Sequence, residues 1–345
     1  MAVRAGVGMG YEGRTGMTKT KLFSLISGLI LLTAGIGLLV GKPFGLRHTA
    51  ARETAKSGAG YACIDPILNI MKKDVKLEME QQGVTDIALY YQDLKTGVWV
   101  AINKDEKFNL ASLIKVPIMI QCLESVESHP ELIKQKLTFT SVRDWNVQQN
   151  IKPPTALERG KAYTLEDTMF RMVAYSDNNA MQMLLQEFPA NDTFQFLRDH
   201  KIEYEQAPDG IKMSLASYVW FFESLYDNSL LNEKMSQKAL SYLAAENFPE
   251  GMHAAVPPGG VVESKFGEKL LLAQDGSVAS TQLHEVGIIQ NGDRPFLIGI
   301  MTSGSSLANL EKVIRDVTRD VFEATKAIPA LVPNKENCLH ASCHS

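Results

Sequence analysis

The stretch FNLASLIKVP, residues 108–117, ends a predicted strand and opens a predicted helix with a serine. Ser112 and Lys115 stand three positions apart, so on a helix their side chains share a face and can meet. A serine hydroxyl becomes an effective nucleophile when a neighbouring base takes its proton. A lysine can be that base where burial lowers its pKa, and the apolar neighbours in this stretch supply burial. Taken alone, the pair favours the simpler interpretation of a serine N-cap followed by a surface lysine.

The elements predicted around this stretch place both ends of one domain in the same sheet. Helices are predicted over 64–82, 112–126, 164–175, 179–188, 192–200, 214–228, 233–246 and 307–326, and strands over 86–93, 98–102, 261–265, 284–290 and 295–302. Asn291-Gly292 marks a hairpin between the last two strands, and a bend is expected after Lys265. This order predicts an α+β fold, an α/β/α sandwich with an antiparallel sheet and an inserted all-helical lobe, over residues 64–328.

The N-terminal region carries one long apolar run. Residues 22–40 contain no charge over 19 positions, which is enough to span a bilayer, and follow a tail at 1–21. We favour an uncleaved membrane anchor over a signal peptide, with 41–63 as a tether. Both interpretations place the domain outside the cytoplasm, on the periplasmic or extracellular face. The net charge of -4 gives no footprint for nucleic acid.

Cysteine and histidine usage predicts no metal and no cofactor. The cysteines are Cys63, Cys122, Cys338 and Cys343, too few for a disulfide framework. We expect Cys122 to be a buried small hydrophobe, and residues 329–345 to be a disordered tail, with a metal site or a small disulfide there as alternatives. The seven histidines form no zinc-ligand spacing within the domain, and no glycine-rich phosphate loop is present.

Two further motifs follow S-x-x-K in a fixed order. S-D-N occupies residues 176–178 at a helix end, and K-F-G occupies 265–267 at the end of a predicted strand. The three together resemble the class A β-lactamase family of serine penicillin-recognising enzymes, whose motifs are S-x-x-K, S-D-N and K-T-G. The segments 164–180 and 284–289 extend the resemblance, which covers nearly the whole predicted domain.

The resemblance implies roles for the residues of the first two motifs. Ser112 would attack a carbonyl and become acylated, and Lys115 would act as base or proton relay. Ser176 would pass the proton to the leaving nitrogen. Asn178 would hold both the amide side chain of the substrate and the lysine.

The third motif is implied to bind the substrate. Lys265 and Gly267 would lie beside the substrate, with the lysine helping to bind its carboxylate. The backbone N–H groups of Ser112 and Glu268 would form the oxyanion hole. The expected ligand is a small-molecule β-lactam or a cell-wall peptide, and the expected state is a monomer.

The first departure from the family pattern is Phe266, at the position where the family has threonine or serine. That hydroxyl binds the substrate carboxylate in the family, and hydrogen bonds to charged groups contribute roughly 1.5–3 kcal/mol. Ser264 and Ser303 are the candidates to replace it.

The second departure is the lack of the family's E-x-x-L-N loop, whose glutamate activates the deacylating water. The segment between His200 and Ser214 is short, and its carboxylates are Glu203, Glu205 and Asp209. Glu203 and Glu205 are weighed as replacement bases against solvated loop charge. The resemblance therefore implies acylation followed by slow deacylation.

Three hypotheses remain open from the sequence. The first is a class A β-lactamase-like serine hydrolase that forms an acyl-enzyme on Ser112 with β-lactam antibiotics. The second is a D,D-peptidase or transpeptidase acting on peptidoglycan peptides. The third is a catalytically weak β-lactam-binding envelope protein, which a Ser112→Ala change would leave unaffected.

Overall fold

A computed structural model describes residues 65–327, apart from Gln82 and 273–277. The N-terminal tail, the apolar run at 22–40, the tether and the C-terminal tail with its two cysteines lie outside the described residues. Within them, no helix has the length and apolar character needed to cross a membrane. Cys122 is buried, as expected, and has its thiol free.

The centre of the fold is a five-stranded antiparallel sheet in the order β2-β1-β10-β9-β8. Its strands are β1 (Val84–Asp93), β2 (Trp99–Ile102), β8 (Val261–Leu272), β9 (Val278–Gln290) and β10 (Phe296–Gly304). The first two strands precede the helical lobe in sequence and the last three follow it. Gly292, at φ 59°, supplies the turn between β9 and β10, so the Asn-Gly hairpin is confirmed.

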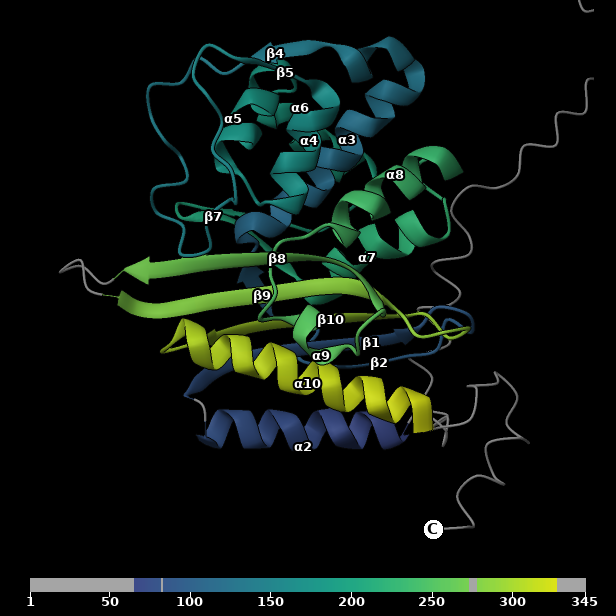
Figure 1. Cartoon of the computed structure of the whole chain (residues 1–345). Helices are drawn as coiled ribbons and strands as arrows, with labels where there is room; N and C mark the ends of the chain where they lie inside the picture. Colours follow the sequence, from purple (N-terminus) through teal and green to yellow (C-terminus); the bar gives the residue numbers. More distant parts are fainter. Residues whose placement is uncertain (1–64, 82, 273–277, 328–345) are drawn as a thin grey trace, which may run out of the picture. The chain divides into compact units, whose positions relative to one another are not determined.

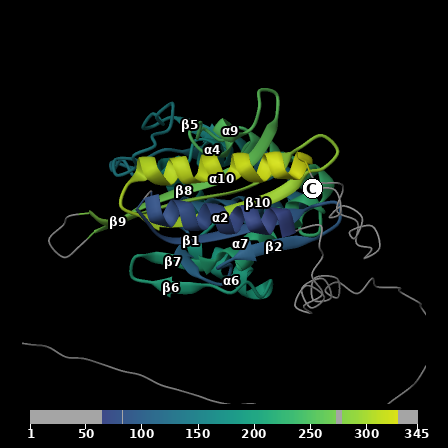
Figure 2. The same cartoon turned by 90° about the horizontal axis from the view of Figure 1, so that it is seen from below.

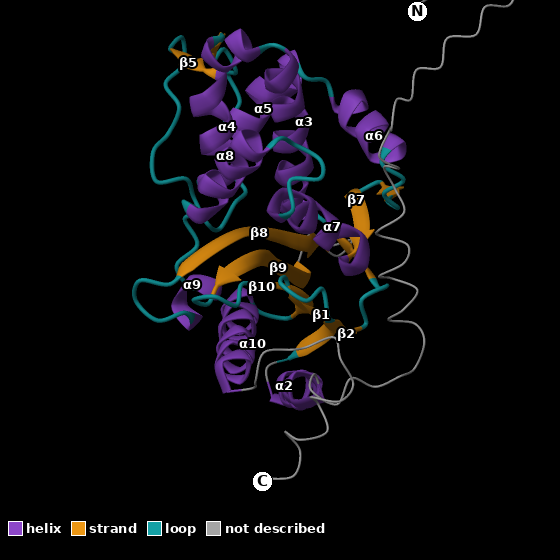
Figure 3. Cartoon of the chain, turned by 90° about the vertical axis from the view of Figure 1, so that its right-hand side faces the viewer, coloured by secondary structure: helices purple, strands orange, loops and turns teal. Residues whose placement is uncertain are grey.

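Helices cover both faces of this sheet (Figures 1 and 3). α2 (Asp65–Gln81) and α10 (Leu307–Ala327) lie side by side on one face, next to the short α9 (Met252–Ala255), as Figure 2 shows from below. The other face carries the helical lobe. Its helices are α3 (Lys115–Ser128), α4 (Leu165–Ala174), α5 (Asn178–Glu187), α6 (Ala190–Asp199), α7 (Leu215–Tyr226) and α8 (Glu233–Ala244), with the 3-10 segments η1 (Ala111–Ile114) and η2 (Pro130–Lys134). The predicted α/β/α sandwich is confirmed.

The central strand β10 shows why the sheet is covered on both sides. Every residue of β10 is buried. Leu297 and Met301 belong to the core shared with the helical lobe, whereas Ile298 and Ile300 belong to the core under α2 and α10. Because successive side chains of a strand point to opposite faces, an apolar run without polar alternation requires a layer on each side.

Strand β8 is longer than predicted. It pairs with β9 from Val261 to Leu272, so the expected bend after Lys265 is absent. Side-chain alternation then directs Phe266 into the core under α2 and α10, where its ring lies 4.7 Å from that of Phe248. The neighbouring positions 265, 267 and 269 face the helical lobe.

Two small sheets complete the described part. β4 (Lys136–Thr138) pairs with β5 (Ala162–Thr164), and the segment between them is a long loop, residues 139–161. The short segment after α6 forms a hairpin, β6 (Glu205–Ala207) and β7 (Gly210–Ser214), and β7 pairs with β3 (Lys107–Asn109). That hairpin was not predicted, and it brings Asp209 beside the start of η1.

Candidate active site

Ser112 was expected to open an α-helix. It lies instead in the 3-10 turn η1, between β3 and α3. Ala111, just before it, has φ 48°, a conformation that needs outside support. The side chain of Asn109 gives that support, because its Oδ1 accepts the Ala111 N–H at 3.0 Å. His284 fixes Asn109 in turn through a 3.0 Å contact from Nε2 to its carbonyl oxygen. Burial lowers the pKa of His284 to about 4, so it serves as a neutral structural donor.

The amine of Lys115 is surrounded by four oxygens. Its Nζ lies 3.0 Å from Ser112 Oγ, 3.1 Å from Ser176 Oγ, 2.6 Å from Ser176 O and 2.7 Å from Asn178 Oδ1. The two carbonyl oxygens can only accept, so they take two N–H groups. A neutral amine then has its lone pair left for a hydroxyl proton of Ser112 or Ser176, which is the arrangement a general base needs.

The environment favours that neutral form. Lys115 is fully buried. Burial, and after it the positive charge of Lys265, lower the pKa of Lys115 well below its ordinary value of 10.5. Desolvation penalises the ammonium, and the nearby like charge adds to the penalty. The alternative of a surface lysine behind a serine cap is therefore wrong for this chain.

The S-D-N turn is held in a strained shape at the start of α5. Ser176 has φ 52°, and the Asp177 carboxylate caps α5 by accepting the Asn179 N–H at 2.8 Å. Asp177 also accepts from Asn146 Nδ2 at 2.8 Å, and Asn146 Oδ1 accepts the Asn178 N–H at 2.7 Å. A cap and a cross-link thus hold the Ser176 hydroxyl and the Asn178 amide against Lys115.

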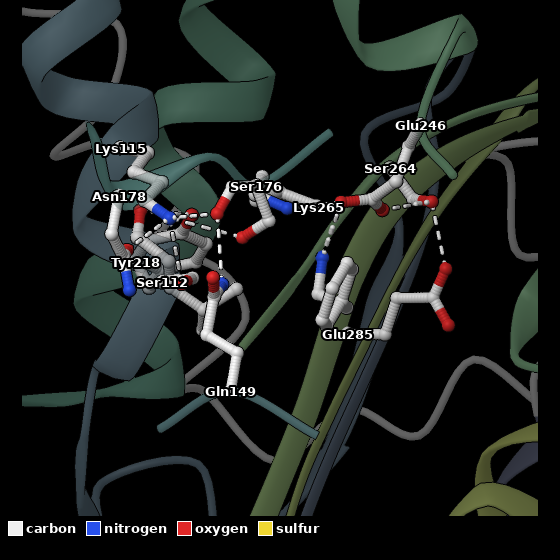
Figure 4. Close-up of polar contacts among 12 residues, drawn as sticks. Ser112, Lys115, Gln149, Ser176, Asn178, Tyr218, Glu246, Ser264, Lys265 and Glu285 are labelled. Atoms are coloured by element: carbon white, nitrogen blue, oxygen red, sulfur yellow. Dashed lines mark hydrogen bonds and ion pairs between the residues drawn. The ribbon is translucent and has the colours of Figure 1, made fainter. Parts of the chain in front are cut away.

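The loop 139–161 forms one wall of the site. Trp145 O accepts from Asn178 Nδ2 at 3.2 Å, which fixes the orientation of that amide. Gln149 Nε2 donates to Ser176 O at 2.9 Å. Gln149 Oε1 is buried and has no hydrogen-bond partner among the described residues. Figure 4 shows Gln149 reaching toward Ser112 and Ser176.

The opposite wall is the free edge of strand β8. A Cβ added to Gly267 would lie 3.1 Å from Ser112 N and 2.9 Å from Leu110 O, so glycine allows the strand to approach the nucleophile closely. Phe266 N–H points away from β9, since it donates to Glu246 at 2.9 Å. Hydrogen-bond directions alternate along a strand, so the N–H of Glu268 points out of the same edge. The geometry agrees with an oxyanion hole formed by the N–H groups of Ser112 and Glu268.

The resemblance implied that Lys265 lies beside the substrate, but Lys265 does not line the pocket. Its side chain is fully buried and forms an ion pair with the equally buried Glu246, which follows α8 (Figure 4). Burial lowers the pKa of Lys265 and raises that of Glu246. Whichever partner holds the proton, the pair carries no net charge.

Two carboxyl groups, those of Glu246 and Glu285, are joined through the Ser264 hydroxyl behind Lys265. Ser264 Oγ is 3.0 Å from Glu246 Oε2 and 2.7 Å from Glu285 Oε1. One hydroxyl proton cannot serve both, so one carboxyl must itself donate. Burial, and after it the charge of Glu246, raise the pKa of Glu285 to about 8, which makes Glu285 the protonated member. Ser264 is therefore fully engaged and does not replace the hydroxyl that Phe266 lacks.

A pocket of about 690 Å³ opens above Ser112. Its described lining comes from three sources: the η1 turn, the loop 139–161 with the start of α5, and strand β8 with the β6–β7 hairpin. The lining residues include Ser112, Lys115, Asn178, Gln149, Glu268, Lys269 and Asp209. Ser176, Lys265 and Gly267 are not among them.

The structure thus gathers Ser112, Lys115, Ser176 and Asn178, and sets Lys265 apart with Glu246. Glu246 and Gln149 carry no signal in the sequence, since each reaches the site only through tertiary packing. Lys269 had a usable signal, because it stands four positions after Lys265 on one strand and so faces the same side.

The candidate replacement bases fall in different places. Glu203 and Glu205 are exposed, and Glu205 lies 3.3 Å from Lys107 Nζ, away from the pocket lining. Asp209 does line the pocket, and its Oδ2 lies 3.5 Å from Lys269 Nζ. Ser303, the other candidate partner for a carboxylate, accepts from Gln282 Nε2 at 3.1 Å on the sheet and does not line the pocket.

The family model described as "Beta-lactamase enzyme family" matches residues 70–325, and no curated protein matches the chain. A β-lactamase from Chitinophaga pinensis is 18% identical with a TM-score of 0.64, over 74% of this chain and 99% of that one. A class A β-lactamase from Mycobacterium abscessus is 21% identical with a TM-score of 0.62, over 74% and 99%. PBP-A is 18% identical with a TM-score of 0.61, over 75% and 96%.

Proposed function

Because the chain belongs to the β-lactamase enzyme family, we propose that it is a serine acyl-transfer enzyme that forms an acyl-enzyme on Ser112 with β-lactam amides. The observation that carries the proposal is the buried Lys115 amine, 3.0 Å from Ser112 Oγ. Burial lowers the pKa of Lys115 well below its ordinary value, which favours the neutral amine and makes it a base in the right place for that hydroxyl.

The acylation step follows from the contacts. Ser112 Oγ attacks the amide carbon while Lys115 Nζ takes its proton. The carbonyl oxygen, now negative, lies between the N–H groups of Ser112 and Glu268, where each donor is worth a few kcal/mol. Lys115 then passes the proton to Ser176 Oγ, 3.1 Å away, and that hydroxyl protonates the leaving nitrogen as the C–N bond breaks.

Deacylation is the weak step of this proposal. A water molecule needs a base, and the described lining offers only Asp209 and Glu268 as carboxylates. Glu268 already accepts three N–H groups from Asn150 and Ile151. Burial opposes the charge of Asp209, but Lys269 and hydrogen bonds outweigh it and lower its pKa below the ordinary value, which makes Asp209 a poor base. We expect an acyl-enzyme that persists.

A lingering acyl-enzyme also suits transfer to an amine, as in a D,D-peptidase or transpeptidase. This second candidate is favoured by the engagement of both carboxylates of the described lining, Glu268 with backbone and side-chain N–H groups and Asp209 with Lys269. Among the similar structures is a mutant of PBP-A described as an acyl-enzyme complex with penicillin G, 18% identical to this chain with a TM-score of 0.61. The two candidates share the first chemical step and differ in what accepts the acyl group.

Intact-protein mass spectrometry tests the shared step. The full chain is incubated with a β-lactam, as the free acid and as its methyl ester, and is followed over hours with Ser112→Ala as control. We expect an adduct that maps to Ser112, persists and is absent from the variant. No adduct with either form would contradict the proposal, and rapid loss of the adduct would show an efficient deacylating base.

Membrane attachment remains part of the proposal. The support is the uncharged run at residues 22–40, which lies outside the described residues. A chain lacking residues 1–40 is expected in the soluble fraction and the full chain in the membrane fraction. Equal partitioning of the two would contradict the anchor.

A further inference from the structure

Among the residues that the structure describes, none places a free positive charge at the end of the site that binds a carboxylate in the resemblance. Lys265 is fully buried and neutralised by Glu246. Phe266 has no hydroxyl, and its ring is buried against Phe248 and lies with its centroid 4.1 Å from Lys265 Nζ. Ser264 is occupied between two carboxyl groups. An anionic group placed at this end would lose its hydration without gaining a charged partner.

The charges that do line the pocket are unfavourable to an anion. Of the described lining residues, Lys115 and Lys269 are the cationic types, and Asp209 and Glu268 are the acidic ones. Lys115 is fully buried with its amine held among four protein oxygens, and burial lowers its pKa well below the ordinary value, so it does not count as a free cation. Lys269 is paired with Asp209: its amine contacts both the backbone carbonyl and the carboxylate of that residue. One paired cation against two carboxylates leaves this lining with a net charge of about -1.

Gln149, which also lines the pocket, adds a hydrogen-bond acceptor. Its Nε2 is bound to Ser176 O, and the carbonyl there can only accept, so the amide cannot be flipped without placing two acceptors together. Oε1 is therefore the atom left buried without a partner among the described residues. Gln149 lies beside Ser176, whose hydroxyl protonates the leaving nitrogen in the proposed mechanism. A buried acceptor without a partner costs free energy, so a substrate with an N–H near Ser176 would be favoured by bonding to Gln149 Oε1.

We propose that this pocket selects acyl donors that carry no carboxylate beside the scissile bond. It takes an uncharged or amine-bearing amide, and Gln149 Oε1 accepts an N–H on the leaving side. The substrate class is thus an amide within a longer or amine-bearing chain rather than one ending in a free carboxylate. The inference rests on the proposed acylation of Ser112.

The first test compares two acyl donors that differ in one charge. Second-order rate constants for Ser112 acylation are measured by intact-mass kinetics with benzylpenicillin and with its methyl ester, each divided by its rate of alkaline hydrolysis. We expect the ester to be favoured by about tenfold or more, the size of one lost charge-assisted contact. An equal or higher normalised rate for the free acid overturns the inference.

A fluorophosphonate, which is neutral and reacts with activated serines, separates the two proposals. Labelling of Ser112 together with preference for the ester supports both. Labelling together with acylation by the free acid but not by the ester overturns the substrate inference alone. No labelling and no acylation overturn the proposed function and the substrate inference with it.

Two variants test the residues named. Asp209→Asn removes a pocket charge and frees Lys269, so it should move the preference toward the free acid by about twofold to fivefold. Glu205→Gln, on the same hairpin but outside the pocket, should leave the preference unchanged. If both variants behave alike, the pocket charge does not set specificity.

Gln149→Leu is tested with an aryl amide and the matching aryl ester, of which only the amide has an N–H on the leaving side. Loss of the acceptor should lower acylation by the amide about tenfold more than acylation by the ester. Equal losses for the two would assign Gln149 to holding the loop alone.

Discussion

The buried carboxyl of Glu285 allows a quantitative test of the polar network behind the site. Its pKa is raised from 4.5 to about 8, first by burial and then by Glu246. A group whose pKa is raised by folding stabilises the protein fully below the unfolded pKa, and that stability is lost as the pH rises through the folded value. Each pKa unit corresponds to about 1.4 kcal/mol. The free energy of unfolding should fall by about 3–5 kcal/mol between pH 4.5 and 8 because of this group alone.

Glu285→Gln should abolish that pH dependence. A glutamine amide reproduces the protonated acid, because its N–H₂ can donate to Ser264 Oγ and its oxygen can accept the Met252 N–H, which is 2.9 Å from Glu285 Oε2. The variant should match the wild type near pH 5 and exceed its stability at pH 9 by about 3–5 kcal/mol. Total stabilities are about 5–15 kcal/mol, so the effect is large.

Urea unfolding at pH 5, 6.5, 8 and 9, followed by circular dichroism, measures this directly. Glu323→Gln, on the exposed side of α10, serves as the matched control and should follow the wild type at every pH. Parallel pH curves for Glu285→Gln and wild type would refute the proton assignment. So would a variant that is less stable at pH 9.

Three further changes test the site and the fold. Lys115→Met should lower the rate of Ser112 acylation about 10²–10⁴-fold while leaving the circular dichroism spectrum unchanged, and a smaller loss would remove Lys115 as the base. Gly267→Ala places a Cβ 2.9 Å from Leu110 O and 3.1 Å from Ser112 N, both backbone atoms, so it should push β8 away, slow acylation about ten- to hundredfold and lower the free energy of unfolding. Burial, and after it the charge of Asp320, raise the pKa of Asp74 to about 7. Asp74→Asn should therefore raise the free energy of unfolding by about 1–3 kcal/mol at pH 8 and leave it unchanged at pH 4. Equal effects at the two pH values would contradict this.

Much of the fold was predictable because its signals are local. The hydrophobic periods of α2 and α10 and the Asn291-Gly292 turn each fix an element without outside help. The extent of β8 was not predictable, since residues 266–272 are held in the strand by pairing with β9. The β6–β7 hairpin likewise depends on its partner β3, so the short polar segment before Ser214 predicts only a loop when its sequence is considered alone.

The candidate site divides along the same line. Ser112, Lys115, Ser176 and Asn178 were found from motif order, because each motif stands at an element boundary that fixes its direction. The burial of Lys265 was missed because its partner Glu246 comes from the end of α8, with no spacing rule linking the two. An ion pair between segments of different elements becomes visible only when the elements are packed together.

The pH dependence of Ser112 labelling tests the central claim that Lys115 is a neutral base. The rate of fluorophosphonate labelling of the full chain is measured from pH 5 to 11 and located by peptide mapping, with Lys115→Met beside it. If burial lowers the pKa of Lys115, the rate reaches its plateau well below pH 10.5 and the variant lacks this titration. A rate that keeps rising to the ordinary lysine value of 10.5, or labelling that is the same in both proteins, would contradict the account.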